Sequence, residues 1–162
     1  MLGLGSKQAK IFPADARQWV DTERAYGARP SDQDLEGLKA AGVITLLHIT
    51  MDGLPSEEDQ RRCERRGLNY VSISLGGTVV DAARANHLLD VLNARHNGPY
   101  YVYDDPGKLS GAAALLFKAI PNFWKFERYA EEAGRRGVDL NAYDGLEKSI
   151  RDYMKRYVRG RR

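Results

Sequence analysis

The stretch that decides the fold runs from residue 100 to residue 120 and reads YYVYDDPGKLSGAAALLFKAI. Its first part, residues 100–104, is a short aromatic and β-branched run that predicts a buried strand. Its last part, residues 109–120, is apolar on every side, which predicts a buried helix. The tight loop between them contains Gly107. A strand, a tight loop and a helix start can bring several backbone N–H groups together, so this segment can form an anion-binding cradle.

Strands and helices alternate along the rest of the chain. Upstream of the cradle, the patterns predict helices at residues 31–41, 55–66 and about 79–95, and strands at residues 43–49 and 68–75. Downstream, they predict helices at residues 122–133 and 140–158. This alternation predicts an α/β fold with three layers, in which a mostly parallel central sheet of about 4–5 strands carries helices on both faces. In such sheets ligands bind at the carboxyl ends of the strands, which directs attention to the cradle.

Composition excludes several classes of protein. Hydrophobic residues make up 43% and charged residues 29% of the 162 residues, which predicts one folded domain over residues 1–162. No apolar run approaches the ~18 residues of a membrane-spanning helix, so no membrane partner is expected. The single cysteine, Cys63, excludes an internal disulfide and a cysteine-based metal cluster, and the three histidines lack metal-ligand spacing. We therefore expect no metal and no cofactor, and the cytoplasm is the predicted compartment.

Several side chains of the predicted helices favour structural roles. Cys63 lies in the middle of helix 55–66 and is expected to be a small buried residue. The arginines of that helix predict a solvated face paired with its glutamates, and they are Arg61, Arg62, Arg65 and Arg66. The aromatic residues after Pro121 predict a buried contact between helices, and they are Phe123, Trp124 and Phe126.

The positive charge of the chain is concentrated at one end. The net charge is +3, and residues 151–162 hold six Arg and Lys against one Asp, so they contribute +5 and the other 150 residues sum to −2. Cations are favourable at a helix C-terminus, so a solvated helix end is the preferred interpretation and nucleic acid is an unlikely partner. Contact of this basic end with an anionic surface or a nucleic acid is kept as an alternative.

The order and spacing of several motifs resemble the cysteine-dependent protein tyrosine and dual-specificity phosphatases, above all their small bacterial members. The matching segments are Arg29-Pro30-Ser31, Leu38-Lys39-Ala40-Ala41-Gly42, Gly67-Leu68-Asn69-Tyr70-Val71, Gly98-Pro99 and the closing helices with Ile150 and Tyr153. The similarity covers roughly residues 10–158. It implies a phosphatase-like fold and places the loop after residue 102 at the family's signature, His-Cys-x-x-Gly-x-x-Arg-Ser/Thr-Gly.

The resemblance also implies that this signature loop is degenerate. Tyr103 stands in place of the histidine, Asp104 in place of the nucleophilic cysteine, and Ser110 in place of the arginine that holds phosphate. Gly107 is retained, and Gly111 stands where Ser or Thr is usual. No catalytic residue is therefore assigned. The family's general acid has two candidate positions, Asp52 and Asp81, for which a structural role is preferred.

The replacements are unfavourable for phosphate chemistry. The family's reaction needs a thiolate nucleophile, which an aspartate does not supply. Asp104 and Asp105 add negative charge at the cradle, and two anions about 4 Å apart repel by ~4 kcal/mol at an effective dielectric constant near 20. The Asp104 carboxylate is expected instead to accept hydrogen bonds from the loop N–H groups and to fill the cradle from within. Tyr103 is expected at the mouth of the pocket.

The sequence therefore predicts a pseudophosphatase that acts by binding a protein partner or a small ligand. The residues expected to contact that ligand are Tyr103, Asp104, Asp105, Gly107, Lys108, Ser110 and Gly111. One alternative is a hydrolase with altered chemistry that uses Asp104 and Asp105, in one version with a divalent cation. The second alternative is the contact of the basic end with an anionic surface or a nucleic acid.

Overall fold

Within the residues that the structure describes, the sheet has four parallel strands. The computed structural model describes residues 19–21, 23–50, 53–74, 83, 86–87, 90, 98–105 and 107–160, the last four by backbone alone. The strands are β1 (Arg24–Gly27), β2 (Thr45–Thr50), β3 (Asn69–Ser74) and β4 (Tyr100–Tyr103), in the order β1-β4-β2-β3. Every pairing is parallel, so the carboxyl ends of all four strands meet at one edge. Because β4 lies inside the sheet, the loop that follows it lies in the middle of that edge.

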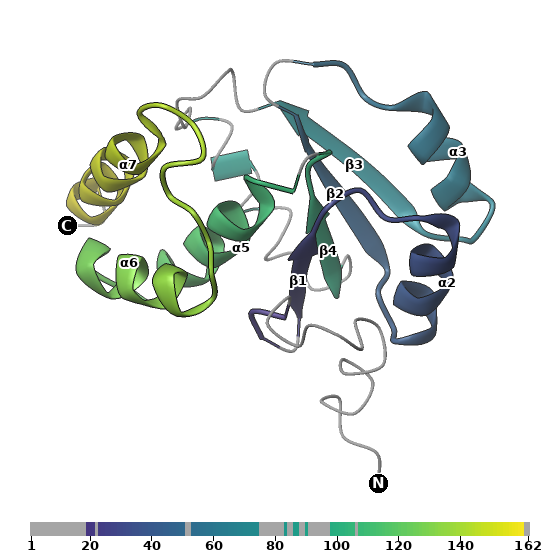
Figure 1. The fold of residues 1–162 in the computed structure, drawn as a ribbon, viewed down its shortest axis with the longest axis horizontal. Helices are drawn as coiled ribbons and strands as arrows, with labels where there is room; N and C mark the ends of the chain where they lie inside the picture. Colours follow the sequence, from purple (N-terminus) through teal and green to yellow (C-terminus); the bar gives the residue numbers. More distant parts are fainter. Residues whose placement is uncertain are drawn as a thin grey trace, which may run out of the picture.

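Helices cover both faces of the sheet, as predicted (Figure 1). One face carries α2 (Asp32–Ala40) and α3 (Glu57–Glu64), and the other carries α5 (Ser110–Ala119), α6 (Phe126–Arg135) and α7 (Leu146–Gly160). Side chains of a strand alternate between faces. Tyr101 and Tyr103 therefore join the core under α2 and α3, whereas Tyr100 and Val102 join the larger core under the other three helices. The predicted three-layer α/β architecture is confirmed.

Helices α2 and α3 start at serine caps. Ser31 accepts a hydrogen bond from the Asp34 amide at 3.0 Å, and the Asp34 carboxylate accepts one from the Ser31 amide at 3.0 Å, which is a capping box. Ser56 caps α3 by accepting from the Asp59 amide at 3.1 Å. This cap fixes Asp59 in the first turn of α3, close to the carboxyl edge of the sheet.

Some predicted element boundaries are wrong. The sequence does not predict β1, because Arg24-Ala25-Tyr26-Gly27 has neither an apolar run nor a clean alternation. The helix predicted from residue 122 begins only at Phe126, because Phe123 adopts φ 57° and the Trp124 amide turns back to bond the Ala119 carbonyl at 3.0 Å. Phe123 is 62% exposed, so the buried contact predicted for it is also wrong.

Two other helices are predicted from the sequence, at residues 140–158 and 79–95. The helix predicted from residue 140 begins at Leu146, after an Asx turn in which Asp139 accepts from the Asn141 amide at 2.8 Å. The helix predicted at residues 79–95 lies largely outside the described residues. Among the residues that the structure describes, no helix is both long and apolar enough to cross a membrane.

Candidate functional site

The loop after β4 is folded around the carboxylate of Asp104. Oδ1 accepts hydrogen bonds from the amides of Leu109 at 3.1 Å and Ser110 at 2.7 Å, and Oδ2 accepts one from the amide of Lys108 at 3.1 Å. Asp104 is only 4% exposed. The N–H groups of Leu109 and Ser110 at the start of α5, which have no partner within the helix, are thus satisfied by a side chain of the same loop. The expectation that Asp104 fills the cradle from within is confirmed.

The same loop packs tightly against the end of β1. The Ser110 hydroxyl is fully buried and donates to the Gly27 carbonyl at 2.7 Å. Gly107 has φ +75°, and a Cβ there would lie 3.0 Å from the Cβ and 3.2 Å from the Cα of Ala28. A side chain at position 107 would therefore meet both backbone strain and a rigid neighbour.

We expect Gly107→Ala to destabilise the protein by about 2 kcal/mol, from the left-handed backbone and the contact with Ala28 together. Urea unfolding at neutral pH measures the change. Gly145→Ala is the matched control, because Gly145 has φ +79° but a Cβ there would meet nothing within 4 Å, so it isolates the backbone cost. Equal losses in the two variants would contradict a tight contact between the loop and Ala28.

Tyr103 faces the α2–α3 layer and not the mouth of the loop. Its hydroxyl is fully buried and donates to Asp59 Oδ2 at 2.7 Å, and its ring stacks on His48 with centroids 4.5 Å apart and planes 5° from parallel. The position predicted for Tyr103 at the pocket mouth is therefore wrong, because the last strand residue points to the face opposite Val102. Burial, followed by the bond to Asp59, raises the pKa of Tyr103.

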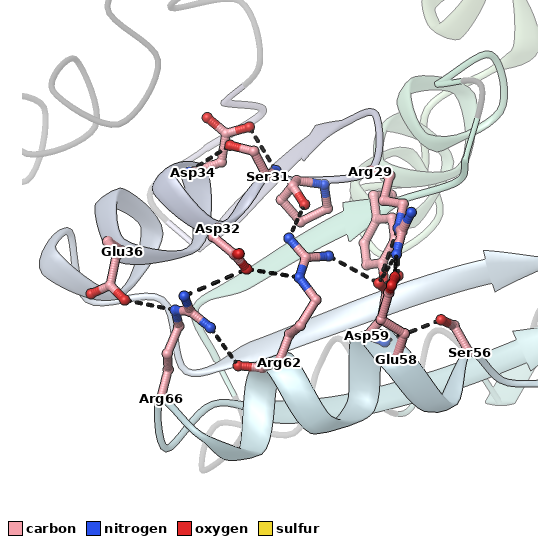
Figure 2. Close-up of polar contacts among 12 residues, drawn as sticks. Arg29, Ser31, Asp32, Asp34, Glu36, Ser56, Glu58, Asp59, Arg62 and Arg66 are labelled. Carbon is pink, nitrogen blue, oxygen red and sulfur yellow. Dashed lines mark hydrogen bonds and ion pairs between the residues drawn. The ribbon is translucent and has the colours of Figure 1, made fainter.

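Asp59 is the centre of a buried polar network that the sequence analysis missed (Figure 2). Besides Tyr103, its carboxylate accepts from Arg29 Nη2 at 2.7 Å, Arg29 Nε at 3.0 Å and Arg62 Nη1 at 3.0 Å. Burial works to raise the pKa of Asp59, but the hydrogen bonds from Arg29, Tyr103 and Arg62 together lower it. Asp59 is thus held as a carboxylate, and it ties the segment after β1 to α3 and to the base of the loop.

The arginines in and just after α3 do not all form the solvated face that was predicted. Arg62 is 9% exposed, and it donates to Asp32 on α2 at 2.9 Å and to the Pro30 carbonyl. Arg66 donates to Glu36, also on α2, at 2.7 Å. Figure 2 shows these side chains bridging the two helices. The prediction was wrong because pairing within one helix is visible in sequence, whereas pairing between helices depends on their packing.

His48 lies beside this network, on β2 next to Tyr103. Its Nδ1 is 2.7 Å from the Tyr70 hydroxyl, which also accepts from the Ser56 amide at 2.9 Å. Burial lowers the pKa of His48, and this outweighs the opposite effect of Asp59, Asp105 and Asp104. The imidazole is therefore uncharged at neutral pH and does not provide a cation for a phosphate group.

The other predicted site residues fall into two groups. Asp105, Gly107 and Lys108 are exposed on the outside of the loop, whereas Gly111 is buried, with Tyr26 and Val138 each 2.9 Å from where its Cβ would lie. The two candidate general acids, Asp52 and Asp81, lie outside the described residues. Within the described ranges, no group of three or more His, Cys, Asp or Glu could hold a metal ion.

Cys63 is separate from the loop. It is 1% exposed and packs on α3 in the core beneath α2 and α3, as expected. Burial raises its pKa to about 11. The thiol is therefore protonated at neutral pH and is not a nucleophile in this state.

The parallel sheet in the order β1-β4-β2-β3, with helices on both faces and the Asp104 loop at its carboxyl edge, has a counterpart among solved structures. This arrangement is the fold of the protein tyrosine and dual-specificity phosphatases, and the resemblance found in the sequence is confirmed at this level. No family model matches the sequence, and no curated protein matches it significantly.

Three solved structures show the likeness. PTPMT1 superposes with a TM-score of 0.72 at 12% identity, over 89% of this chain and 97% of that one. The core catalytic domain of the PP-IP phosphatase SIW14 from S. cerevisiae gives 0.64 at 14% identity, over 85% and 87%. TpbA from P. aeruginosa in complex with pTyr gives 0.62 at 18% identity, over 82% and 85%. At these identities the likeness shows the fold alone.

Proposed function

We propose that this chain is a catalytically inactive phosphatase-fold protein of the cytoplasm, a pseudophosphatase, that acts by binding a protein partner or a small ligand. The observation that carries the proposal is the Asp104 carboxylate, which occupies three of the loop's N–H groups. An incoming phosphate would have to displace that carboxylate or approach it closely. Both routes are unfavourable, because the two anions repel at short range in a partly desolvated site.

The chemistry of the remaining groups supports the same proposal. The chain has one cysteine, and its thiol is buried and protonated at neutral pH. The Ser110 hydroxyl is committed to the Gly27 carbonyl, so it does not point a donor at a ligand in the loop. Loss of one preorganised donor of the kind that an arginine provides typically costs ~3–4 kcal/mol in a transition state. The loop at residues 103–111 therefore has neither a thiolate nucleophile nor an arginine to stabilise charge on a phosphate group.

The exposed part of the loop is the surface that we assign to the partner. Asp105, Gly107 and Lys108 lie on the outside, while Asp104 and Ser110 hold the loop in shape from within. In this assignment Asp104 and Ser110 have structural roles, and the partner contacts the exposed residues of the loop. The loop can serve this role without changing conformation, because its hydrogen bonds are already made.

The test is hydrolysis of a generic aryl phosphate by the purified protein. We expect no turnover above buffer, and no change in Cys63→Ser, which removes the only thiol. Turnover that Asp104→Ala abolishes would show an aspartate-dependent hydrolase and overturn the proposal. Turnover that Cys63→Ser abolishes would overturn it as well, since it would reveal thiolate chemistry.

A further inference from the structure

Helix α7 has two opposite faces. Leu146, Ile150, Tyr153 and Met154 are buried and pack in the larger core. Lys148, Arg151 and Lys155 are exposed, and their spacing of three and four residues places them on one side of the helix, away from that core. Figure 1 shows α7 at the outer end of the molecule, in the layer opposite α2 and α3.

The positive charge of this side grows toward the end of the helix. Lys148 pairs with Asp152 at 2.9 Å, and Arg151 pairs with Glu147 at 3.0 Å. Beyond Asp152 the sequence contains no further acid, whereas Lys155, Arg156 and Arg159 follow within the helix. Residues 155 and 159 are four positions apart, so their backbone positions lie on the same side of the helix. From residue 148 to residue 159 the helix rises about 16 Å, and basic positions recur along that length.

One cation of the row is held in place before any ligand arrives. The Arg151 guanidinium lies over the Phe126 ring, 4.6 Å from its centroid, at the start of α6. A cation over an aromatic face is attracted to it, and a stacked guanidinium still presents its N–H edge to a ligand. The Arg151 side chain remains 46% exposed. Less side-chain entropy is therefore lost when Arg151 binds an anionic group.

We propose that the α7 basic stripe, defined as the row Lys148, Arg151 and Lys155 with the exposed Arg156 at its flank, docks along the phosphate backbone of a nucleic acid duplex without reading its base sequence. A duplex carries one negative charge per ~1.7 Å of axis, so it offers phosphates along the whole row. This inference is independent of the phosphatase-like loop, which lies at the carboxyl edge of the sheet. It develops the alternative kept for the basic end of the chain, contact with a nucleic acid, which the sequence alone favoured less than a solvated helix end.

A nucleic acid fits this surface better than a membrane does. Among the α7 side chains that the structure describes, residues 146–156, no large hydrophobic side chain is exposed, because the apolar ones are all turned into the core. An interfacial helix needs an apolar face that can enter the lipid. Exposed cations along one side of a helix are instead complementary in charge to a linear polyanion such as a duplex. Binding between the two depends on charge and needs no burial of apolar side chains.

The test is fluorescence anisotropy of a labelled DNA duplex with the full chain, over a range of salt concentrations. With four phosphate contacts, the plot of log Kobs against log salt concentration should have a slope of about −3.6 or steeper. The double variant Lys155→Gln, Arg156→Gln should make that slope shallower by about 1.8. Its matched control is Arg61→Gln, Arg65→Gln, which removes the same charge from exposed positions in the last turn and at the C-cap of α3 and should leave the slope unchanged.

Several results would overturn this proposal. One is the absence of binding at 50 mM salt, and another is an unchanged slope in the α7 double variant. An equal change in the α3 control would show that only net charge matters. Tighter binding to vesicles that contain phosphatidylserine than to the duplex would assign the surface to a membrane. None of these results bears on aryl phosphate hydrolysis, so the two proposals fail separately.

Discussion

Replacing Asp104 with alanine should make the loop after β4 bind oxyanions such as sulfate more tightly than the wild type does. The variant keeps the backbone N–H groups of Lys108, Leu109 and Ser110 but removes the carboxylate that they bind. The repulsion that disappears is ~4 kcal/mol at a separation of about 4 Å and a dielectric constant near 20. That corresponds to roughly a 1,000-fold gain in affinity for sulfate, at about 1.4 kcal/mol per factor of ten.

The same substitution should cost stability when no anion is present, because buried N–H groups lose their acceptor. Thermal unfolding measured against sulfate concentration follows both effects. The Asp104→Ala protein should start with a lower Tm than the wild type and should gain more from added sulfate, since a ligand that binds only the folded state stabilises it.

Asp105→Ala is the matched control for this prediction. Asp105 is the adjacent residue and carries the same charge, but it is exposed and solvent screens it. We expect its response to sulfate to stay near that of the wild type. If sulfate raises the Tm of Asp105→Ala as much as that of Asp104→Ala, the net negative charge of the loop governs anion binding, and the occupation of its N–H groups does not. If neither variant gains, the loop N–H groups do not form an anion site at all.

The second large effect is expected at Asp59. Asp59→Ala should lower the free energy of unfolding by about 3 kcal/mol, because it leaves the Arg62 charge and the Tyr103 hydroxyl without their buried acceptor. Arg29 contributes little to this loss, since its side chain is 39% exposed and solvent screens the pair. Asp32→Ala is the matched control, because Asp32 also accepts from Arg62 but is 66% exposed, and it should cost clearly less than Asp59→Ala.

The pH dependence of stability has a definite sign at this position. The folded-state pKa of Asp59 is lowered, so its contribution is fully present above the unfolded value near 3.9 and is lost as the pH falls through the folded value. Asp59→Asn, which does not titrate, should lose this acid step. Urea unfolding at pH 7, 4 and 3 tests it, and an acid step of wild-type size in Asp59→Asn would contradict the assignment.

The sequence predicted those features that depend on local pattern. The parallel sheet follows from the alternation of strands with helices, and the Ser31–Asp34 cap follows from adjacent residues. Asp104 at the start of α5 is another local case, because a carboxylate just before a helix finds unpaired N–H groups within a few residues. In each case the partners are close in the chain.

The features that sequence analysis missed all depend on contacts between distant segments. Asp59 meets Arg29 across 30 positions and Tyr103 across 44, and nothing in either segment signals the contact. The side of the sheet that Tyr103 faces decides whether it reaches a ligand or a core carboxylate. That side was not assigned, because a strand buried on both faces shows no polar alternation. The short strand β1 was not predicted for a similar reason, because its pairing with β4, and not its composition, makes it a strand.

The hydroxyl of Ser110 also bears on how this protein could change by mutation. It is a short side chain in a fully enclosed position, and its bond to the Gly27 carbonyl joins the first turn of α5 to the end of β1. An arginine at position 110 would replace this hydroxyl in a fully buried position and remove its bond to the Gly27 carbonyl. Substitutions at this position therefore act on the link between α5 and β1 before they can act on a ligand.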